Sequence, residues 1–269
     1  MYAFDYVKPG SVDEALQALQ TEDAQAISGG QTLIPTLKAR LARPSQLVDL
    51  TGIPELRGLE ATAEAVTLRG GATHGTVARD PEVNRVFPAL ASLAARIGDP
   101  AVRNRGTVGG SIANNDPSAC YPAAALGTGA TVVAQGSNGR REIAADDYFQ
   151  GMFMTALEEG EIVAAVRFPV PERARYEKFI QPASRFALVA AFVAKFGDGV
   201  RVAITGASEN GVFRWSEAEQ ALGAGFSADA LDALQPPAAD EMIADIHGSK
   251  EYRAHLCKVM TRRAVAAAA

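Results

Sequence analysis

The segment from Asp99 to Pro122 limits what this chain can fold into and bind more than any other segment does, because it places three glycines and a run of polar side chains in one short stretch. It reads DPAVRNRGTVGGSIANNDPSACYP. Glycine reaches positive φ and lets the backbone approach a ligand closely, so Gly109 and Gly110 are able to aim successive N–H groups at an anion. The hydroxyl and amide groups that follow, such as those of Ser111 and Asn114, suit a ligand with many oxygens. The alternative is a glycine-rich surface turn with solvated asparagines.

A second glycine pair lies upstream, in the sequence Ser28-Gly29-Gly30-Gln31-Thr32. It follows a short strand-like run from Ala24 to Ile27 and precedes leucines at Leu33, Leu37 and Leu41. This pattern predicts a strand, a turn and a helix, an arrangement that leaves backbone N–H groups free to bind a phosphate. The motif is neither a P-loop nor GxGxxG, so a plain tight turn is the alternative. Two such turns indicate one extended ligand held at two points, as the diphosphate of a dinucleotide would be.

Composition excludes several classes of protein. The chain has 269 residues, 48% of them hydrophobic, and its 26 basic and 31 acidic side chains give a formal charge of −5. This balance does not support nucleic-acid binding, and no apolar run is long enough for a membrane span. The N-terminus has no signal-peptide pattern, and two cysteines are too few for an iron–sulfur cluster, so we expect a cytoplasmic protein. The three histidines show no metal-ligand spacing, so we expect no metal site.

Hydrophobic periodicity predicts a mixture of strands and helices. A capping-box pattern at Ser11 to Glu14 opens the first helix, and Gly136 to Gly139 is typical of a hairpin turn. Pro169-Val170-Pro171 interrupts the pattern and predicts a domain boundary. The predicted strands are 24–27, 47–50, 66–69, 131–134, 140–143, 162–168, 187–196, 200–205 and 212–215. The predicted helices are 12–20, 33–41, 87–97, 119–126, 216–222, 228–234 and 252–266.

Three segments, in this order, carry a family resemblance. They are SGGQTLIPTLKARLARPSQLVDLTGIPEL, IGDPAVRNRGTVGGSIANNDPSACYPAA and YEKFIQPASRFALVAAFVA. They resemble the FAD-binding medium subunit of the molybdenum hydroxylases, the relatives of carbon monoxide dehydrogenase and xanthine dehydrogenase. The similarity extends over nearly the whole chain, including the tail HGSKEYRAHLCKVMTRRAV.

The resemblance implies an α+β fold. A FAD-binding domain of the PCMH or vanillyl-alcohol-oxidase type would cover residues 1–170, with subdomains of about 1–55 and 56–170. A C-terminal flavoprotein domain of antiparallel sheet and helices would cover 175–269. The resemblance also implies that two diphosphate-binding turns, the ribityl contacts and a lysine near the flavin ring hold the cofactor. The residues concerned are Ser28, Gly29, Gly30, Gln31, Thr32, Leu33, Thr107, Val108, Gly109, Gly110, Ser111, Asn114, Asp116 and Lys178.

Five side chains leave alternatives open. Lys178 is implied to stabilise negative charge on the reduced flavin, and a solvated strand lysine is the alternative. Cys120 stands where many relatives have an aspartate, so local ribityl contacts are expected to differ, and a small buried hydrophobe is favoured over a redox role. His74 is interpreted as structural rather than flavin-contacting. Arg103 and Arg105 are assigned either to the diphosphate or to a surface or subunit contact.

The implied function is electron transfer by an oxidoreductase subunit that does not itself act on the carbon substrate. FAD would be its cofactor, with molybdopterin and 2Fe-2S clusters only on partner subunits. Those partners would be a small iron–sulfur subunit and a large molybdopterin subunit, in a dimer of heterotrimers. A stand-alone FAD-dependent oxidase or reductase is the first alternative, and a non-enzymatic dinucleotide-binding module is the second. No catalytic and no metal-ligating residue is predicted.

Overall fold

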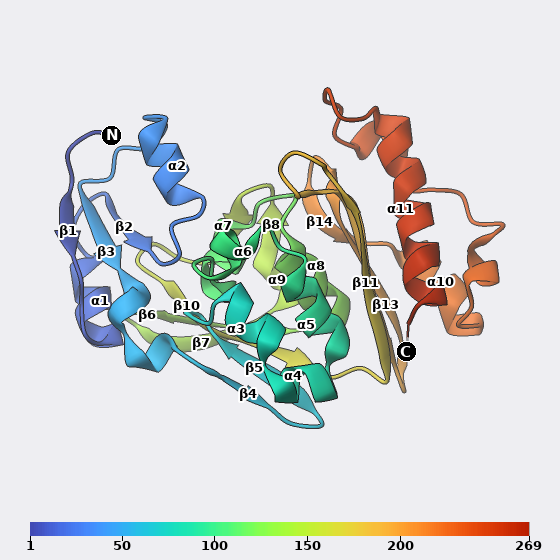
Figure 1. The fold of residues 1–269 in the computed structure, drawn as a ribbon, viewed down its shortest axis with the longest axis horizontal. Helices are drawn as coiled ribbons and strands as arrows, with labels where there is room; N and C mark the ends of the chain where they lie inside the picture. Colours follow the sequence, from blue (N-terminus) through green and yellow to red (C-terminus); the bar gives the residue numbers. More distant parts are fainter. Residues whose placement is uncertain (269) are drawn as a thin grey trace.

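The computed structural model describes residues 1–268; Ala269, the last residue of the predicted C-terminal domain, lies outside the described residues. Three sheets follow one another across the molecule, from the N-terminal part in blue to the C-terminal part in orange and red (Figure 1). The fold is α+β, as predicted. Among residues 1–268, no helix has the length and apolar character needed to cross a membrane.

The N-terminal sheet is small and parallel, with strand order β1-β3-β2. The predicted capping box is present: the Ser11 hydroxyl accepts a hydrogen bond from the N–H of Glu14, and the Glu14 carboxylate accepts one from the N–H of Gly10. The helix that it opens packs Ala15 and Leu16 against the sheet. The elements are β1 (Asp5–Val7), α1 (Val12–Ala18), β2 (Ala24–Ile27), α2 (Leu33–Lys38) and β3 (Gln46–Asp49), followed by the 3-10 turns η1 (Leu50–Gly52) and η2 (Pro54–Leu56).

The second sheet has strand order β4-β5-β10-β6-β7, and all its pairs are antiparallel. Its strands are β4 (Leu59–Ala61), β5 (Ala65–Arg69), β6 (Thr131–Gly136), β7 (Gly139–Ala144) and β10 (Ile162–Pro169), and the short hairpin β8 (Phe149–Gly151) and β9 (Met154–Thr155) lies beside it. Helices cover this sheet (Figure 1). They are α3 (His74–Arg79), α4 (Pro81–Val86), α5 (Pro88–Ala95), α6 (Pro100–Arg103), α7 (Val108–Asn114), α8 (Cys120–Thr128) and α9 (Ala145–Tyr148).

The C-terminal sheet is an antiparallel meander with strand order β11-β12-β13-β14. Helix α8 covers one face and α11 covers the other (Figure 1). Both faces of β12 are therefore buried, and this explains why its residues 187–194 are all apolar rather than alternating. The elements are β11 (Arg173–Ile180), β12 (Ala187–Phe196), β13 (Gly199–Ser208), β14 (Gly211–Arg214), α10 (Ser216–Ala224), η3 (Ala228–Leu231), η4 (Ala239–Glu241) and α11 (Lys250–Ala266).

The sequence-based prediction was wrong for three segments. Leu41 does not continue the buried stripe of α2, because the helix ends at Lys38 and the Leu41 side chain is 80% exposed. Residues 228–234 form the 3-10 turn η3 rather than an α-helix. The segment after Thr107 was predicted as a turn, but Val108–Asn114 is helix α7.

Candidate functional site

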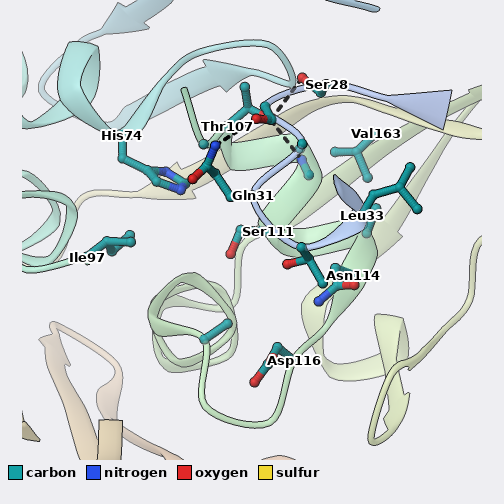
Figure 2. A pocket seen from close by; sticks show the side chains of 18 of the residues that line it. Ser28, Gln31, Leu33, His74, Ile97, Thr107, Ser111, Asn114, Asp116 and Val163 are labelled. Atoms are coloured by element: carbon teal, nitrogen blue, oxygen red, sulfur yellow. Dashed lines mark hydrogen bonds between the residues drawn. The ribbon is translucent and has the colours of Figure 1, made fainter. Parts of the chain in front are cut away.

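A cavity of about 490 Å³ lies where the N-terminal sheet, helix α7 and strand β11 meet. Side chains from elements far apart in the sequence converge on it, including Leu33 of α2, Asn114 of α7 and Val163 of β10 (Figure 2). The volume is typical of a site for a small molecule or cofactor. This cavity is the candidate functional site.

The structure brings the sequence-predicted residues together at this cavity, with one exception. Val108 is fully buried in the core and does not line the cavity. The residues that line it are Ser28, Gly29, Gly30, Gln31, Thr32, Leu33, Thr107, Gly109, Gly110, Ser111, Asn114, Asp116 and Lys178.

The two glycine turns are in direct contact. A Cβ atom on Gly29 would lie 2.1 Å from the carbonyl oxygen of Arg105, so no other residue fits between the turns. The Thr107 hydroxyl donates a hydrogen bond to the Ser28 hydroxyl over 3.1 Å. Gly109 also packs closely, since a Cβ there would lie 2.7 Å from the carbonyl oxygen of Gly70. Glycine is therefore required at these two positions by the approach of one backbone to another.

The two turns differ in whether their N–H groups have hydrogen-bond acceptors among the described residues. In the second turn, the N–H of Gly109 donates to the carbonyl of Gly70, and the N–H of Gly110 donates to the capping hydroxyl of Thr107. The expectation that these two N–H groups are aimed at an anion is therefore wrong. In the first turn, the N–H groups of Gly30 and Gln31 have no acceptor within residues 1–268. The donors for an anion thus come from the first turn.

Polar side chains continue from the turns along the cavity. The carboxylate of Asp116 accepts a hydrogen bond of 2.8 Å from the N–H of Ser118, and burial raises its pKa above the ordinary value. The loop that holds Asp116 is fixed from behind, because the Thr205 hydroxyl donates to the carbonyls of Pro117 and Ala119. Ser111, Asn114 and Asp116 come from α7 and the turn that follows it, and all three line the cavity with polar groups (Figure 2).

Lys178 is buried, which rules out the alternative of a solvated lysine. Only 6% of its surface is exposed, and its ammonium donates to the carbonyl of Arg96 over 3.1 Å and contacts the Cys120 sulfur at 3.5 Å. No carboxylate among the described residues pairs with it. A buried ammonium with only neutral acceptors gains from a further electronegative partner. Lys178 therefore supplies a cation to whatever fills this end of the cavity.

His74 also lines the cavity wall, as Figure 2 shows. Its ring packs against Gly106, which has no side chain to displace it, and against the ring of Tyr121 at 5.4 Å. Its Nδ1 is buried and has no hydrogen-bond partner within the described part of the chain. Burial, and to a lesser extent the charge of Arg103, lowers the pKa of His74 to about 4.

The lowered pKa of His74 predicts that acid destabilises this protein. The unfolded histidine takes up a proton near its ordinary pKa, whereas the folded one stays neutral, so stability falls as the pH drops below about 6.5. Between pH 7 and pH 5.5 we expect a loss of about 1 kcal/mol of unfolding free energy from this residue. Urea unfolding of His74→Phe at both pH values checks this expectation, because the variant loses the difference in unfolding free energy between the two pH values. His255→Asn, at an exposed position, is the control and keeps that difference.

Several residues at the site were not predicted from the sequence as cavity residues. Ile97 was expected in a buried helix stripe, yet it lies beyond the end of α5 and lines the cavity. Arg103 was assigned to a diphosphate or a partner, but its guanidinium donates to the carbonyls of Ile97 and Gly98, both over 3.0 Å, and so fixes that loop. Further lining residues, among them Phe153, Val163, Arg185 and Phe186, come from loops and strand ends that carry no local binding motif.

The residues present fit a flavin dinucleotide. Two backbone turns meet so closely that a Cβ would fill the space between them. The free N–H groups of the first turn suit a diphosphate, and the hydroxyls and amides beyond suit a polyol chain. The buried Lys178 ammonium has only neutral hydrogen-bond partners, so it suits the electronegative edge of a large polar ligand.

Comparison with known proteins gives matches over the whole chain. Residues 2–171 match the family described as "FAD binding domain in molybdopterin dehydrogenase", and residues 175–268 match the "CO dehydrogenase flavoprotein C-terminal domain". The chain is 34% identical to the carbon monoxide dehydrogenase medium chain of Hydrogenophaga pseudoflava and 36% identical to the nicotine 6-hydroxylase medium subunit of Paenarthrobacter nicotinovorans, covering 98% of this chain and 96% of each relative.

Solved structures give the same result. The reconstituted CO dehydrogenase from Oligotropha carboxidovorans superposes with a TM-score of 0.90 at 33% identity, covering 98% of this chain and 96% of that one. Quinoline 2-oxidoreductase from Pseudomonas putida 86 superposes with a TM-score of 0.82 at 32% identity, with the same coverage.

Proposed function

The chain belongs to the family of FAD-binding subunits of molybdopterin dehydrogenases that includes the carbon monoxide dehydrogenase medium chains, and on that basis we propose that it is an electron-transfer subunit. It is an oxidoreductase subunit, and its cofactor is FAD. We propose that it takes electrons from iron–sulfur clusters of a partner subunit and delivers them to an external acceptor. Bound FAD supplies the electron chemistry, and the protein sets its orientation and potential.

The proposed partners are a small iron–sulfur subunit and a large molybdopterin subunit, assembled as a dimer of heterotrimers in the cytoplasm. The names of the relatives support this proposal, because "medium chain" and "medium subunit" describe one chain among several. Substrate specificity then resides in the large subunit, and this chain is not expected to act on the carbon substrate by itself.

The observation that carries the proposal is the meeting of the two glycine turns at one cavity that also contains a buried ammonium. We propose that the turn at Ser28 to Thr32 holds the diphosphate through its free N–H groups. Thr107 positions the second turn, and its hydroxyl fixes Ser28 for the same contact. Leu33, Asn114 and Asp116 are proposed to line the path of the ribityl chain and diphosphate, and Lys178 to face the flavin ring.

The experiment that tests this function uses the purified full-length chain. We expect it to carry a visible flavin absorbance, and we expect this absorbance to bleach only when the companion subunits and their substrate are added. Bleaching by a small substrate in the absence of companion subunits indicates a stand-alone oxidase or reductase instead. A colourless chain that takes up no FAD contradicts both functions.

The charge of Lys178 predicts a shift in the flavin potential. The ammonium favours the reduced, more negative form, so Lys178→Met is expected to lower the midpoint potential. A charge pair in a partly buried site contributes about 1–3 kcal/mol, which for a two-electron couple is roughly 20–60 mV. Spectroelectrochemical titration of the flavin-loaded chain measures the shift. Lys195→Met, on the neighbouring strand β12 and away from the cavity, is the matched control, and an equal shift in both variants contradicts the role.

A further inference from the structure

A second hollow, of about 400 Å³, adjoins the cavity of the candidate site. The two spaces share the wall formed by Ser28, Gly29 and Thr107, so the second hollow reaches the same pair of glycine turns. Its own polar lining comes from Thr51, Arg57, Thr73, Thr76, Asn104 and Arg105, and the proposed electron-transfer function uses none of these six residues.

Three guanidinium groups from separate elements gather at this hollow. Arg57 follows η2 and Arg105 follows α6, and both line it. Arg79, the last residue of α3, contacts Asn104 in its wall, with its Nη1 3.5 Å from the amide oxygen. None of the three arginines forms an ion pair with a carboxylate within residues 1–268, and no described residue that lines the hollow is acidic. The hollow is therefore a positive region on a chain whose formal charge is −5.

Neutral hydrogen-bonding groups accompany the arginines. The hydroxyls of Thr73 and Thr76 are hydrogen-bonded to each other over 2.9 Å. The guanidinium of Arg57 donates to the carbonyl of Thr51, which orders this long side chain before any ligand binds. A guanidinium carries five N–H donors in a planar fork that matches the oxygens of a phosphate, and hydroxyls and amides add further bonds to the same oxygens.

The side chain of Arg105 belongs to this hollow and not to the cofactor cavity. Arg105 is absent from the described residues that line the candidate site, whereas it lines the second hollow. Its backbone is held in place, because its carbonyl oxygen packs where a Cβ on Gly29 would lie, 2.1 Å away. The guanidinium therefore extends from a fixed point beside the glycine turns. Like charges gathered without a counter-charge repel one another, so the three arginines gain from a bound anion.

We propose that this hollow is a second anion site, which binds the phosphate or diphosphate group of a small molecule separate from the proposed cofactor. Its volume suits a small ligand. An acidic face of a companion subunit is the other partner that exposed arginines attract, but a flat protein surface does not reach the hydroxyls of a concave hollow. The several oxygens of a phosphate match a lining of guanidinium, hydroxyl and amide groups. Inorganic phosphate and the phosphates of a nucleotide share this chemistry, and neither requires the proposed electron-transfer function.

The test measures binding of inorganic phosphate, pyrophosphate and ADP to the purified full-length chain by calorimetric titration at low ionic strength. The chain is first saturated with FAD, so that the cofactor cavity is closed to the probes. We expect pyrophosphate to bind saturably, and we expect Arg57→Met and Arg105→Met each to weaken it about tenfold, since each removes a charged donor. Arg105→Lys keeps the charge but loses the planar fork, so it is expected to weaken binding less than Arg105→Met.

Arg140→Met is the matched control. Arg140 lies in β7, is exposed, donates to the Gln135 amide oxygen and, like Arg105, forms no ion pair within the described part of the chain. It lines neither cavity, so Arg140→Met is expected to bind pyrophosphate as the original chain does. Since Arg57 and Arg105 come from different elements, one variant still reads out the site if the other does not fold.

The three probes separate the sources of the anion. Binding of ADP as tight as that of pyrophosphate supports a nucleotide ligand, and binding of the inorganic anions alone supports free phosphate. Absence of saturable binding overturns the site, and so does equal weakening by Arg105→Met and Arg140→Met, which indicates general attraction of anions. An original chain that binds no probe, together with loss of companion subunits from Arg105→Met, also overturns it and assigns the arginines to a subunit contact. A chain that takes up no FAD contradicts the proposed function alone, and the same titrations of that chain and its variants still test the anion site.

Discussion

Replacing Gly29 with alanine is expected to abolish FAD retention. The new methyl group would lie 2.1 Å from the carbonyl oxygen of Arg105 and 2.7 Å from the Cα of Gly106, and both of these are backbone atoms that no rotamer change displaces. Overpacking of this kind costs about 1–3 kcal/mol and is relieved by moving the two turns apart. Because the first turn is proposed to hold the diphosphate and the second turn to fix Ser28 for that contact, we expect FAD affinity to fall roughly 100-fold.

The measurement is the flavin content of the purified full-length variant, followed by titration of the flavin-free chain with FAD. Gly10→Ala is the control, since a Cβ there meets only the Glu14 carboxylate, at 3.6 Å. We expect that control to retain its flavin. A Gly29→Ala chain that folds and binds FAD normally would show that the contact between the turns is structural and that the cofactor is held elsewhere.

Much of the fold could be predicted because its signals are local. The capping box at Ser11, the short run Ala24–Ile27 and the hairpin turn before Gly139 each specify their element within a few residues, and the structure contains all three elements. The strand at 187–196 was also predicted from its apolar residues, and it is β12. The family resemblance then supplied the order of these elements and the cofactor.

The predictions that failed depend on contacts between distant segments. The glycine pair at Gly109 and Gly110 was expected to bind an anion. Their N–H groups instead donate hydrogen bonds to the Gly70 carbonyl and the Thr107 hydroxyl, because α7 begins there and packs beside β5. Nothing near Phe153 in the sequence marks it as a cavity residue. Its position depends on the side chain of Asn115, which precedes it by 38 positions. Such partners become visible only when the chain is folded.

The predicted domain boundary has a local sequence signal, but the functional site is built from residues on both sides of it. Pro169-Val170-Pro171 interrupts the patterning, and the second sheet ends with β10 at Pro169. Lys178 of β11, which lies beyond that break, nevertheless lines the cavity, and α8 packs on β12 and β13. The division into domains at this point stays a prediction, and the site depends on both sides of it.

That dependence predicts a large effect for Arg253→Met, although Arg253 does not line the cavity. Arg253 lies in α11 and is 3% exposed; its guanidinium donates to the carbonyls of Leu188 and Gly206 over 2.8 and 2.7 Å, and to the carboxylate of Asp245 over 2.7 Å. Removing it leaves two buried carbonyls without their charged donor. We expect a loss of about 3 kcal/mol of unfolding free energy, which lowers the melting temperature by roughly 6–12 °C in a chain of this size.

The loss should extend to the flavin site, because the N–H of Gly206 donates to the carbonyl of Pro117 over 2.7 Å, one residue from Asp116. Thermal unfolding of the flavin-free chain measures the stability, and FAD titration below the melting temperature measures the site. Arg167→Met is the matched control: its guanidinium pairs with Glu142 at 3.3 Å but is half exposed, and such surface pairs contribute about 0–1 kcal/mol. An Arg253→Met chain as stable as that control would show that α11 is held by apolar packing alone. A destabilised Arg253→Met chain with unchanged FAD affinity would show that the loop at Asp116 keeps its position without support from the C-terminal helix.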